Sequence, residues 1–277
     1  MTGTDRVDRY GVMGNPIEHS KSPRIHRLFA AQTGRSIVYD AILVAPGRFA
    51  DAVNDFIQHA GKGLNVTVPF KQDAWRIARR LSERAQRAGA VNTLTLAADG
   101  ALTGDNTDGT GLVRDLTGNL GQTLAAKQVL VLGAGGAARG ILAPLLEQHP
   151  ARLVIANRTV ERAQELAVQF ADLGDLQGCG FADLAGKRFD IVINATAAGL
   201  QAQVPELPDG IMDADSCCYD LMYASEPTAF VRYAQQLGVR SAFDGLGMLV
   251  EQAAESFLVW HGIRPDTEPV IKALRRQ

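Results

Sequence analysis

The stretch Val129-Leu130-Val131-Leu132-Gly133-Ala134-Gly135-Gly136-Ala137-Ala138 decides the fold of this chain. Four apolar residues predict a buried strand, and the glycines after them predict a tight turn into a helix. In such a turn Gly133 permits the bend, Gly135 lets the backbone approach a pyrophosphate, and Ala138 allows close helix–strand packing. A glycine-rich turn can also form without a ligand. The strand before it and the helix after it favour a dinucleotide site over that alternative, because the helix start offers unpaired N–H groups to phosphates.

The end of the following strand indicates which dinucleotide is bound. An NAD site usually has a carboxylate there for the ribose 2′-hydroxyl. This chain has Asn157, Arg158 and Thr159 at that point, with Arg162 one helical step further. Guanidinium groups can pair with a 2′-phosphate that a carboxylate would repel, and Thr159 can cap the helix. Arginines at such a place are often only solvated surface residues, but their position predicts NADP.

The rest of the chain is typical of an α/β protein. Short apolar segments alternate with amphipathic helical patterns, which predicts mostly parallel strands. A length of 277 residues exceeds the usual size of one core, so we expect two domains. We predict an N-terminal α/β substrate domain with a mostly parallel sheet over residues 1–107, and a Rossmann-type NADP domain over 108–244. C-terminal helices over 245–277 would return to the first domain, and the cleft between the domains would hold the ligands.

Composition excludes several classes of partner. The formal net charge is −2 and the pI is near 6.2, which supplies no basic field for nucleic acid or a membrane surface. No apolar run is long enough to span a bilayer, and the polar first residues do not resemble a signal peptide. Three cysteines, at positions 179, 217 and 218, predict reduced thiols in a cytoplasmic protein, and no metal-ligand spacing occurs.

Four polar residues are candidates for a substrate site. Ser20 and Ser22 lie at a predicted helix start, where two hydroxyls can hold a carboxylate, although capping alone would explain Ser22. Lys71 follows a predicted strand, where a solvated charge is the ordinary alternative. Asp108 lies in a helix-start sequence, so it could be only an N-cap. A lysine paired with an aspartate can exchange a proton with an alcohol during hydride transfer, but the residues themselves do not single out this pair.

At these residues the chain resembles the shikimate dehydrogenase family of NADP-dependent enzymes. The matching stretches run in the family's order from near the start to the penultimate helix, which makes their joint occurrence specific. They are GNPIEHSKSP (14–23), NVTVPFK (65–71), AGAVNT (88–93), GDNTDG (104–109), the glycine turn, NRT (157–159) and DGLGMLVEQAA (244–254). The resemblance implies reversible reduction of 3-dehydroshikimate to shikimate, a step of aromatic amino-acid biosynthesis.

The resemblance also implies a role for each matching residue. Lys71 would be the general acid/base, and Asp108 would orient it together with the reacting hydroxyl. The substrate carboxylate would lie against Ser20, Ser22 and Tyr223, and its hydroxyls against Thr67, Asn92, Asp108 and Gln252. The cofactor would contact Gly133, Ala134, Gly135, Gly136 and Ala137 through its pyrophosphate, Asn157, Arg158, Thr159 and Arg162 at its adenosine end, Leu221 and Gly245 beside the nicotinamide, and Glu83.

The family pattern leaves alternatives open. After Asn194-Ala195-Thr196 the family often carries serines, whereas this chain has Ala197-Ala198-Gly199. The serine pair at positions 20 and 22 favours shikimate, yet a dehydrogenase that also uses quinate is the next interpretation. A catalytically silent NADP-sensing protein would be expected to lack Lys71 or Asp108. We expect a monomer or a homodimer.

Overall fold

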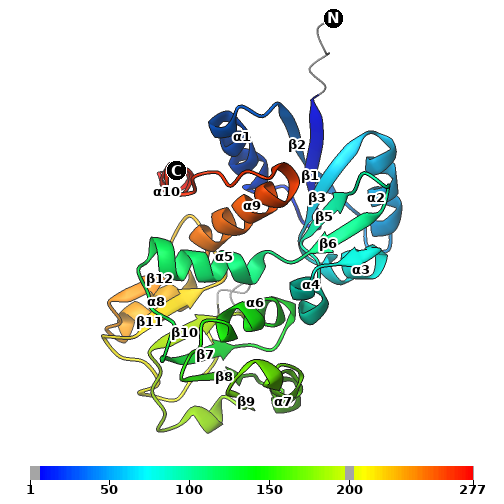
Figure 1. Cartoon of the computed structure of the whole chain (residues 1–277). Helices are drawn as coiled ribbons and strands as arrows, with labels where there is room; N and C mark the ends of the chain where they lie inside the picture. Colours follow the sequence, from blue (N-terminus) through cyan, green and yellow to red (C-terminus); the bar gives the residue numbers. More distant parts are fainter. Residues whose placement is uncertain (1–6, 197–202, 277) are drawn as a thin grey trace, which may run out of the picture. The chain divides into compact units, whose positions relative to one another are not determined.

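A computed structural model describes residues 7–196 and 203–276 of the chain. It has the α/β architecture that the sequence predicts, with two sheets and helices between their strands (Figure 1). Two compact units divide it, one of residues 7–108 with Val250–Arg276, the other of Gly109–Leu249. The division falls after Asp108 and Leu249, whereas the predicted limits follow residues 107 and 244.

The first unit contains a mixed six-stranded sheet. Strands β2, β1 and β3 are parallel neighbours, and β5 and β6 continue the sheet as an antiparallel hairpin. The hairpin turns at Gly100, whose φ of 78° suits glycine, and an Asp-Gly pair such as Asp99-Gly100 is a common hairpin turn. The strands are β1 (Asp8–Gly14), β2 (Ile37–Leu43), β3 (Gly61–Val66), β4 (Arg80–Leu81), β5 (Thr93–Leu96) and β6 (Leu102–Asp105).

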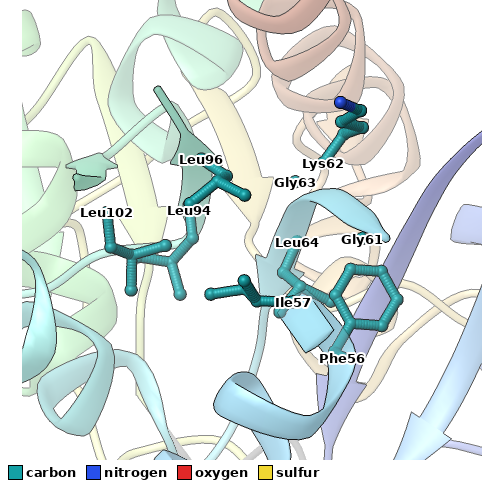
Figure 2. Close-up of a pocket in the computed structure, with 9 residues that line it drawn as sticks. All are labelled: Phe56, Ile57, Gly61, Lys62, Gly63, Leu64, Leu94, Leu96 and Leu102. Atoms are coloured by element: carbon teal, nitrogen blue, oxygen red, sulfur yellow. The ribbon is translucent and has the colours of Figure 1, made fainter. Parts of the chain in front are cut away.

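Helices cover this sheet because their apolar stripes match its apolar faces. They are α1 (Ser22–Thr33), α2 (Phe49–Gln58), α3 (Lys71–Ile77) and α4 (Glu83–Ala88). Phe49, Val53 and Phe56 of α2 join Leu64 and Leu94 in one buried cluster. A small pocket next to these residues is lined mainly by apolar side chains and by the start of β3, which includes Lys62 (Figure 2). It includes none of the candidate site residues.

The start of α1 differs in detail from its prediction. Ser22 was expected to be the N-cap, but Lys21 occupies that position and no side chain caps the helix there. The hydroxyl of Ser20 instead accepts the Ser22 N–H at 3.3 Å. The helix ends at Gly34 with a φ of 66°, as its glycine predicts.

The C-terminal helices complete the first unit, as predicted. They are α9 (Leu246–His261) and α10 (Glu268–Arg275). Trp260 of α9 stacks on Tyr10 of β1 with ring centroids 4.7 Å apart, and its Nε1 donates to the carbonyl of Leu94 at 3.1 Å. Gln32 of α1 accepts from the N–H of Asp266, just before α10, at 3.0 Å. These contacts fix α9 against the sheet.

The second unit is a six-stranded parallel sheet in the order β12-β11-β10-β7-β8-β9. This is the order of a doubly wound dinucleotide-binding sheet, in which the chain changes direction between β7 and β10. Its strands are β7 (Gln128–Leu132), β8 (Arg152–Ala156), β9 (Leu176–Cys179), β10 (Ile191–Asn194), β11 (Cys217–Asp220) and β12 (Ser241–Phe243). The main helices are α5 (Asp108–Arg114), α6 (Gly136–Leu146), α7 (Val160–Gln169) and α8 (Ala229–Gln236).

Strand β7 contains the apolar run Val129–Leu132, in which apolar residues do not alternate with polar ones. Val129 and Val131 pack into one buried cluster, and Leu130 and Leu132 pack into another. Parallel sheets are covered by helices on both faces, so consecutive side chains are buried in opposite directions. All four side chains are fully buried.

The cysteines of the second unit's β11 are buried. Cys217 and Cys218 are buried in β11, and burial raises the pKa of each thiol to about 12, so neither provides a thiolate. Over residues 7–196 and 203–276, no helix combines the length and the apolar character that crossing a bilayer requires. Within the same ranges, no group of three or more histidine, cysteine or acidic side chains is arranged to hold a metal ion.

Candidate active site

Lys71 and Asp108 form an ion pair in the first unit. Lys71 is the first residue of α3, and its Nζ lies 2.6 Å from Oδ2 of Asp108. The backbone carbonyl of Lys71 accepts from the N–H of Val91, which ties the start of α3 to the segment before β5. The lysine side chain is 28% exposed and the aspartate side chain 6%. The amine is therefore reachable from solvent while the carboxylate that holds it is buried.

The carboxylate of Asp108 can pair with Lys71 because another side chain makes the capping hydrogen bond at the start of α5. The ordinary alternative for Asp108 was an N-cap, but Asp108 is already the first helical residue of α5. The side-chain oxygen of Asn106 accepts the Asp108 N–H at 3.1 Å, and Asn106 Nδ2 donates to the carbonyl of Ala90 at 3.1 Å. Asn106 thus takes the capping interaction, and sequence reasoning missed this residue.

Asn92 contacts the other oxygen of the carboxylate, and Gln252 contacts Asn92. Asn92 Nδ2 lies 2.8 Å from Oδ1 of Asp108 and 2.9 Å from Oε1 of Gln252. Gln252 lies on α9, so Asn92 links this helix to the buried carboxylate. The structure therefore brings together Lys71, Asn92, Asp108 and Gln252, four of the residues predicted to contact the substrate or act on it.

Ser20, Ser22 and Thr67 also belong to the first unit. All three are half-buried, and Ser20 and Ser22 are joined by the hydrogen bond at the start of α1. Thr67 follows β3, and its N–H donates to the carbonyl of Met13 at 2.9 Å. Tyr223 follows β11 in the second unit, where burial raises the pKa of its phenol. That Ser20, Ser22 and Tyr223 hold the substrate carboxylate stays a prediction, as does the contact of Thr67 with a substrate hydroxyl.

The glycine turn after β7 is shaped for a ligand. Gly133 has a φ of 102°, and a Cβ there would meet the carbonyl oxygen of Ala195 at 3.0 Å, so both backbone conformation and space require glycine. Gly135 and Gly136 are exposed, and a Cβ on either would meet nothing within 4 Å. Among the described residues, packing does not demand these glycines, and they leave room for a ligand to approach the backbone closely.

The start of α6, directly after the glycine turn, can attract an anion. Gly135 is the N-cap residue and makes no side-chain capping hydrogen bond, and the first N–H groups of a helix have no partner within it. Ala134 is half-buried and Ala137 exposed, whereas Ala138 is fully buried against the sheet. An anion at this helix start would be stabilised by the N–H groups and the helix dipole. The residues present therefore fit a dinucleotide pyrophosphate.

The residues after β8 fit a phosphate at the adenosine end. Arg158 and Arg162 are exposed, and within the described part of the chain neither guanidinium is paired with a carboxylate. Asn157 donates through Nδ2 to the carbonyl of Thr159 at 2.8 Å, which shapes the turn. Thr159 is the N-cap residue of α7, but its side chain makes no capping hydrogen bond, contrary to the prediction. Its hydroxyl remains available to a ligand.

Three further residues were predicted to contact the cofactor. Leu221 and Gly245 are in contact in the second unit, and Glu83 belongs to the first unit. A Cβ on Gly245 would meet the carbonyl oxygen of Leu221 at 2.3 Å, so glycine is required where these two backbones touch. Glu83 is the first residue of α4 in the first unit, 86% exposed, with Oε1 3.8 Å from Nε of Arg87. Its contact with a cofactor stays a prediction. Ala197, Ala198 and Gly199, where the family often has serines, lie outside the described residues.

Next to Asn92 lies a group of polar residues, three of them buried and Asn65 half-buried, whose roles sequence reasoning missed. They are Asn65, Thr93, Thr107 and Ser256. One signal was available for Ser256, because it stands four residues after Gln252 and therefore on the same face of α9.

Three family models match the chain along most of its length. They are the shikimate dehydrogenase substrate binding domain over residues 12–94, shikimate / quinate 5-dehydrogenase over 115–203, and the shikimate 5′-dehydrogenase C-terminal domain over 245–275.

Relatives of known name agree with these models. The chain is 59% identical over 270 residues to a shikimate dehydrogenase (NADP(+)) of Methylococcus capsulatus, covering 98% of this chain and 97% of the relative. A crystal structure of an Ael1 enzyme from Pseudomonas putida has 46% identity and a TM-score of 0.92, covering 96% of this chain and 98% of that one. A shikimate 5-dehydrogenase from Thermus thermophilus, solved with NADP(H) and shikimate, has 32% identity and a TM-score of 0.86, covering 98% and 99%.

Proposed function

The chain belongs to the shikimate dehydrogenase family, and from this membership we propose that Lys71 and Asp108 exchange the proton in its reaction. The activity is that of an NADP-dependent oxidoreductase, the reversible reduction of 3-dehydroshikimate to shikimate in aromatic amino-acid biosynthesis. The cofactor is NADP, which when bound supplies or accepts the hydride.

The proton moves between Lys71 and the reacting oxygen. During ketone reduction the protonated amine of Lys71 donates to the oxygen that becomes the alcohol, and in the reverse direction the amine takes that proton back. Asp108 holds the amine at 2.6 Å and directs it. Because Asp108 is buried and fixed by Asn92, the amine is placed before the substrate arrives.

The remaining polar residues of the first unit orient the substrate. Thr67, Asn92 and Gln252 would hydrogen-bond its hydroxyls, and Ser20 and Ser22 would hold its carboxylate with Tyr223. Gln252 uses its oxygen for Asn92, which turns its NH₂ group outward as a donor. Positioning of this kind decides which hydroxyl faces Lys71.

The dinucleotide is held by residues of the second unit. Gly133, Ala134, Gly135, Gly136 and Ala137 would bind the pyrophosphate at the start of α6. Asn157, Arg158, Thr159 and Arg162 would bind the adenosine end, where the unpaired guanidinium groups select the 2′-phosphate. Leu221 and Gly245 would line the nicotinamide ring, and Glu83 would contact the cofactor from the first unit.

The observation that carries this proposal is the ion pair between Lys71 and the buried Asp108, joined to Asn92 and Gln252. The test is an assay of the purified chain with shikimate and NADP, followed by the absorbance of NADPH. We expect turnover with both present and none when shikimate is omitted. Absence of turnover, both with shikimate and NADP and with 3-dehydroshikimate and NADPH, would contradict the proposal.

A broader activity toward quinate is the second candidate, because one matching family model is named for both substrates. Specificity constants measured for shikimate and quinate, each with NADP and with NAD, distinguish the two. We expect the highest value for shikimate with NADP, since Ser20 and Ser22 form the pattern that favours shikimate. A comparable value for quinate would establish the broader enzyme. We further propose that the protein acts in the cytoplasm as a monomer or a homodimer.

A further inference from the structure

A buried chain of hydrogen bonds extends from β2 to the carboxylate of Asp108, entirely within the first unit. The Tyr39 hydroxyl lies 2.7 Å from Oδ1 of Asn65, and Asn65 Nδ2 lies 2.9 Å from Oγ of Ser256. Ser256 Oγ lies 2.7 Å from Oγ1 of Thr93, which lies 2.9 Å from Oδ1 of Asn92. Asn92 Nδ2 ends the chain at Asp108.

Fixed backbone groups determine how the two amides of this chain, Asn65 and Asn92, are oriented. Asn92 Oδ1 accepts the N–H of Thr107 at 2.9 Å, so the other end of the amide, Nδ2, must be the one that faces Asp108. Asn65 Nδ2 reaches the carbonyl of Asn92 at 3.2 Å, so Asn65 donates toward Ser256. Ser256 Oγ lies 2.7 Å from Oγ1 of Thr93 and 3.1 Å from the carbonyl of Gln252, and we assign its single hydrogen to the shorter contact. With Ser256 donating to Thr93 and Thr93 donating to Asn92, these side chains point their donors toward the carboxylate.

Burial makes this order consequential. Thr93 and Ser256 are fully buried and Asn92 is 2% exposed. A buried polar group without a partner costs free energy, so water does not replace a missing hydroxyl here at no cost. If the oxygen and nitrogen of the Asn92 amide exchanged places, the oxygen would face two other hydrogen-bond acceptors. These are the carboxylate of Asp108 and the side-chain oxygen of Gln252.

We propose that Thr93 and Ser256 are positioning residues of the reaction, which act by keeping the Asn92 amide turned with Nδ2 toward Asp108 and Gln252. Neither hydroxyl touches Lys71 or Asp108. Thr93 donates to Oδ1 of Asn92, and Ser256 contacts Thr93. The Nδ2 group of Asn92 then stays on the carboxylate of Asp108, which positions the lysine amine. The inference rests on the proposed role of Lys71 and Asp108.

The test compares Thr93→Val, which removes the hydroxyl and keeps the shape, with Thr93→Ser, which keeps the hydroxyl. We expect kcat with shikimate to fall roughly five- to tenfold in Thr93→Val, the effect of one buried hydrogen bond. KM for NADP stays within about twofold, and Thr93→Ser restores most of kcat. Thr103→Val is the matched control, because its hydroxyl donates only to the carbonyl of Thr95 on the same hairpin.

A double-mutant cycle separates a shared action on Asn92 from two independent structural effects. We expect Ser256→Ala alone to lower kcat about two- to threefold, and its addition to Thr93→Val to lower kcat little further. Unchanged kcat in Thr93→Val, an equal loss in Thr93→Ser, or additive losses would overturn the proposal. If Thr93→Val does not fold, an unchanged kcat in Ser256→Ala overturns it. If the unmodified protein itself shows no turnover with shikimate and NADP, the proposed function is refuted instead.

Discussion

Replacing Asp108 by asparagine tests whether a negative charge must hold the lysine amine. The amide has the size of the carboxylate and can still accept from Asn92, so the fold around it is kept. What changes is the group that faces Lys71 at 2.6 Å, which loses its charge. An amide NH₂ turned toward an ammonium group places donors against donors. Lys71 then leaves the geometry needed for proton transfer.

The magnitude follows from the role and the burial of the pair. Loss of positioned acid/base catalysis lowers kcat by about 10²–10⁴-fold. Breaking a fully buried ion pair costs about 3–5 kcal/mol and an exposed one about 0–1 kcal/mol. The Lys71 side chain is 28% exposed, so the pair is only partly buried and we expect the free energy of unfolding to fall by about 1–2 kcal/mol.

The assay measures kcat, KM for shikimate, and thermal unfolding of the same preparation. Asp73→Asn is the control, because Asp73 forms an exposed ion pair at 2.7 Å with Arg76 on α3, the helix that carries Lys71. The control keeps wild-type turnover. A kcat for Asp108→Asn within threefold of wild type would refute the reasoning, because the charge would then be dispensable.

Two other predictions concern the cofactor and stability. Arg158→Ala raises KM for NADPH far more than KM for NADH, since only the former has a 2′-phosphate to pair; equal changes in steady-state kinetics would count against NADP selection by this residue. Burial lowers the pKa of His26 to about 3, against about 6.5 in an unfolded chain, so neutral His26 supports the fold fully above about pH 6.5 and this support is lost as pH falls toward 3. His26→Phe therefore weakens the pH dependence of the unfolding free energy in that window, which is measured by chemical unfolding at several pH values. Identical slopes for the variant and the wild type would show that His26 does not titrate on unfolding.

The elements of the second unit could be predicted because local sequence determines them. The run from Val129 to Leu132 is buried on both faces, and Gly133 is required by its backbone angle and by Ala195. Strands β9 and β12 were not predicted. They are short strands at the two edges of the sheet, so their sequences carry little apolar pattern.

The candidate site shows where local reasoning ends. Asn106 and Asp108 are equally good capping residues, and only the tertiary pairing of Asp108 with Lys71, 37 positions away, leaves the capping interaction to Asn106. In the same way Ser20, rather than Ser22, supplies the hydroxyl at the start of α1. The buried network of Thr93 and Ser256 depends on α9 lying against the sheet, which spacing along the chain does not show.

The most direct test of the central claim is turnover and shikimate binding measured together for Lys71→Ala. We predict that kcat falls by about 10²–10⁴-fold while the Kd for shikimate, measured by calorimetry with NADP present, changes only a few-fold. A variant that binds shikimate and still reduces NADP at the wild-type rate would contradict the account, because the amine held by Asp108 would then take no part in moving the proton.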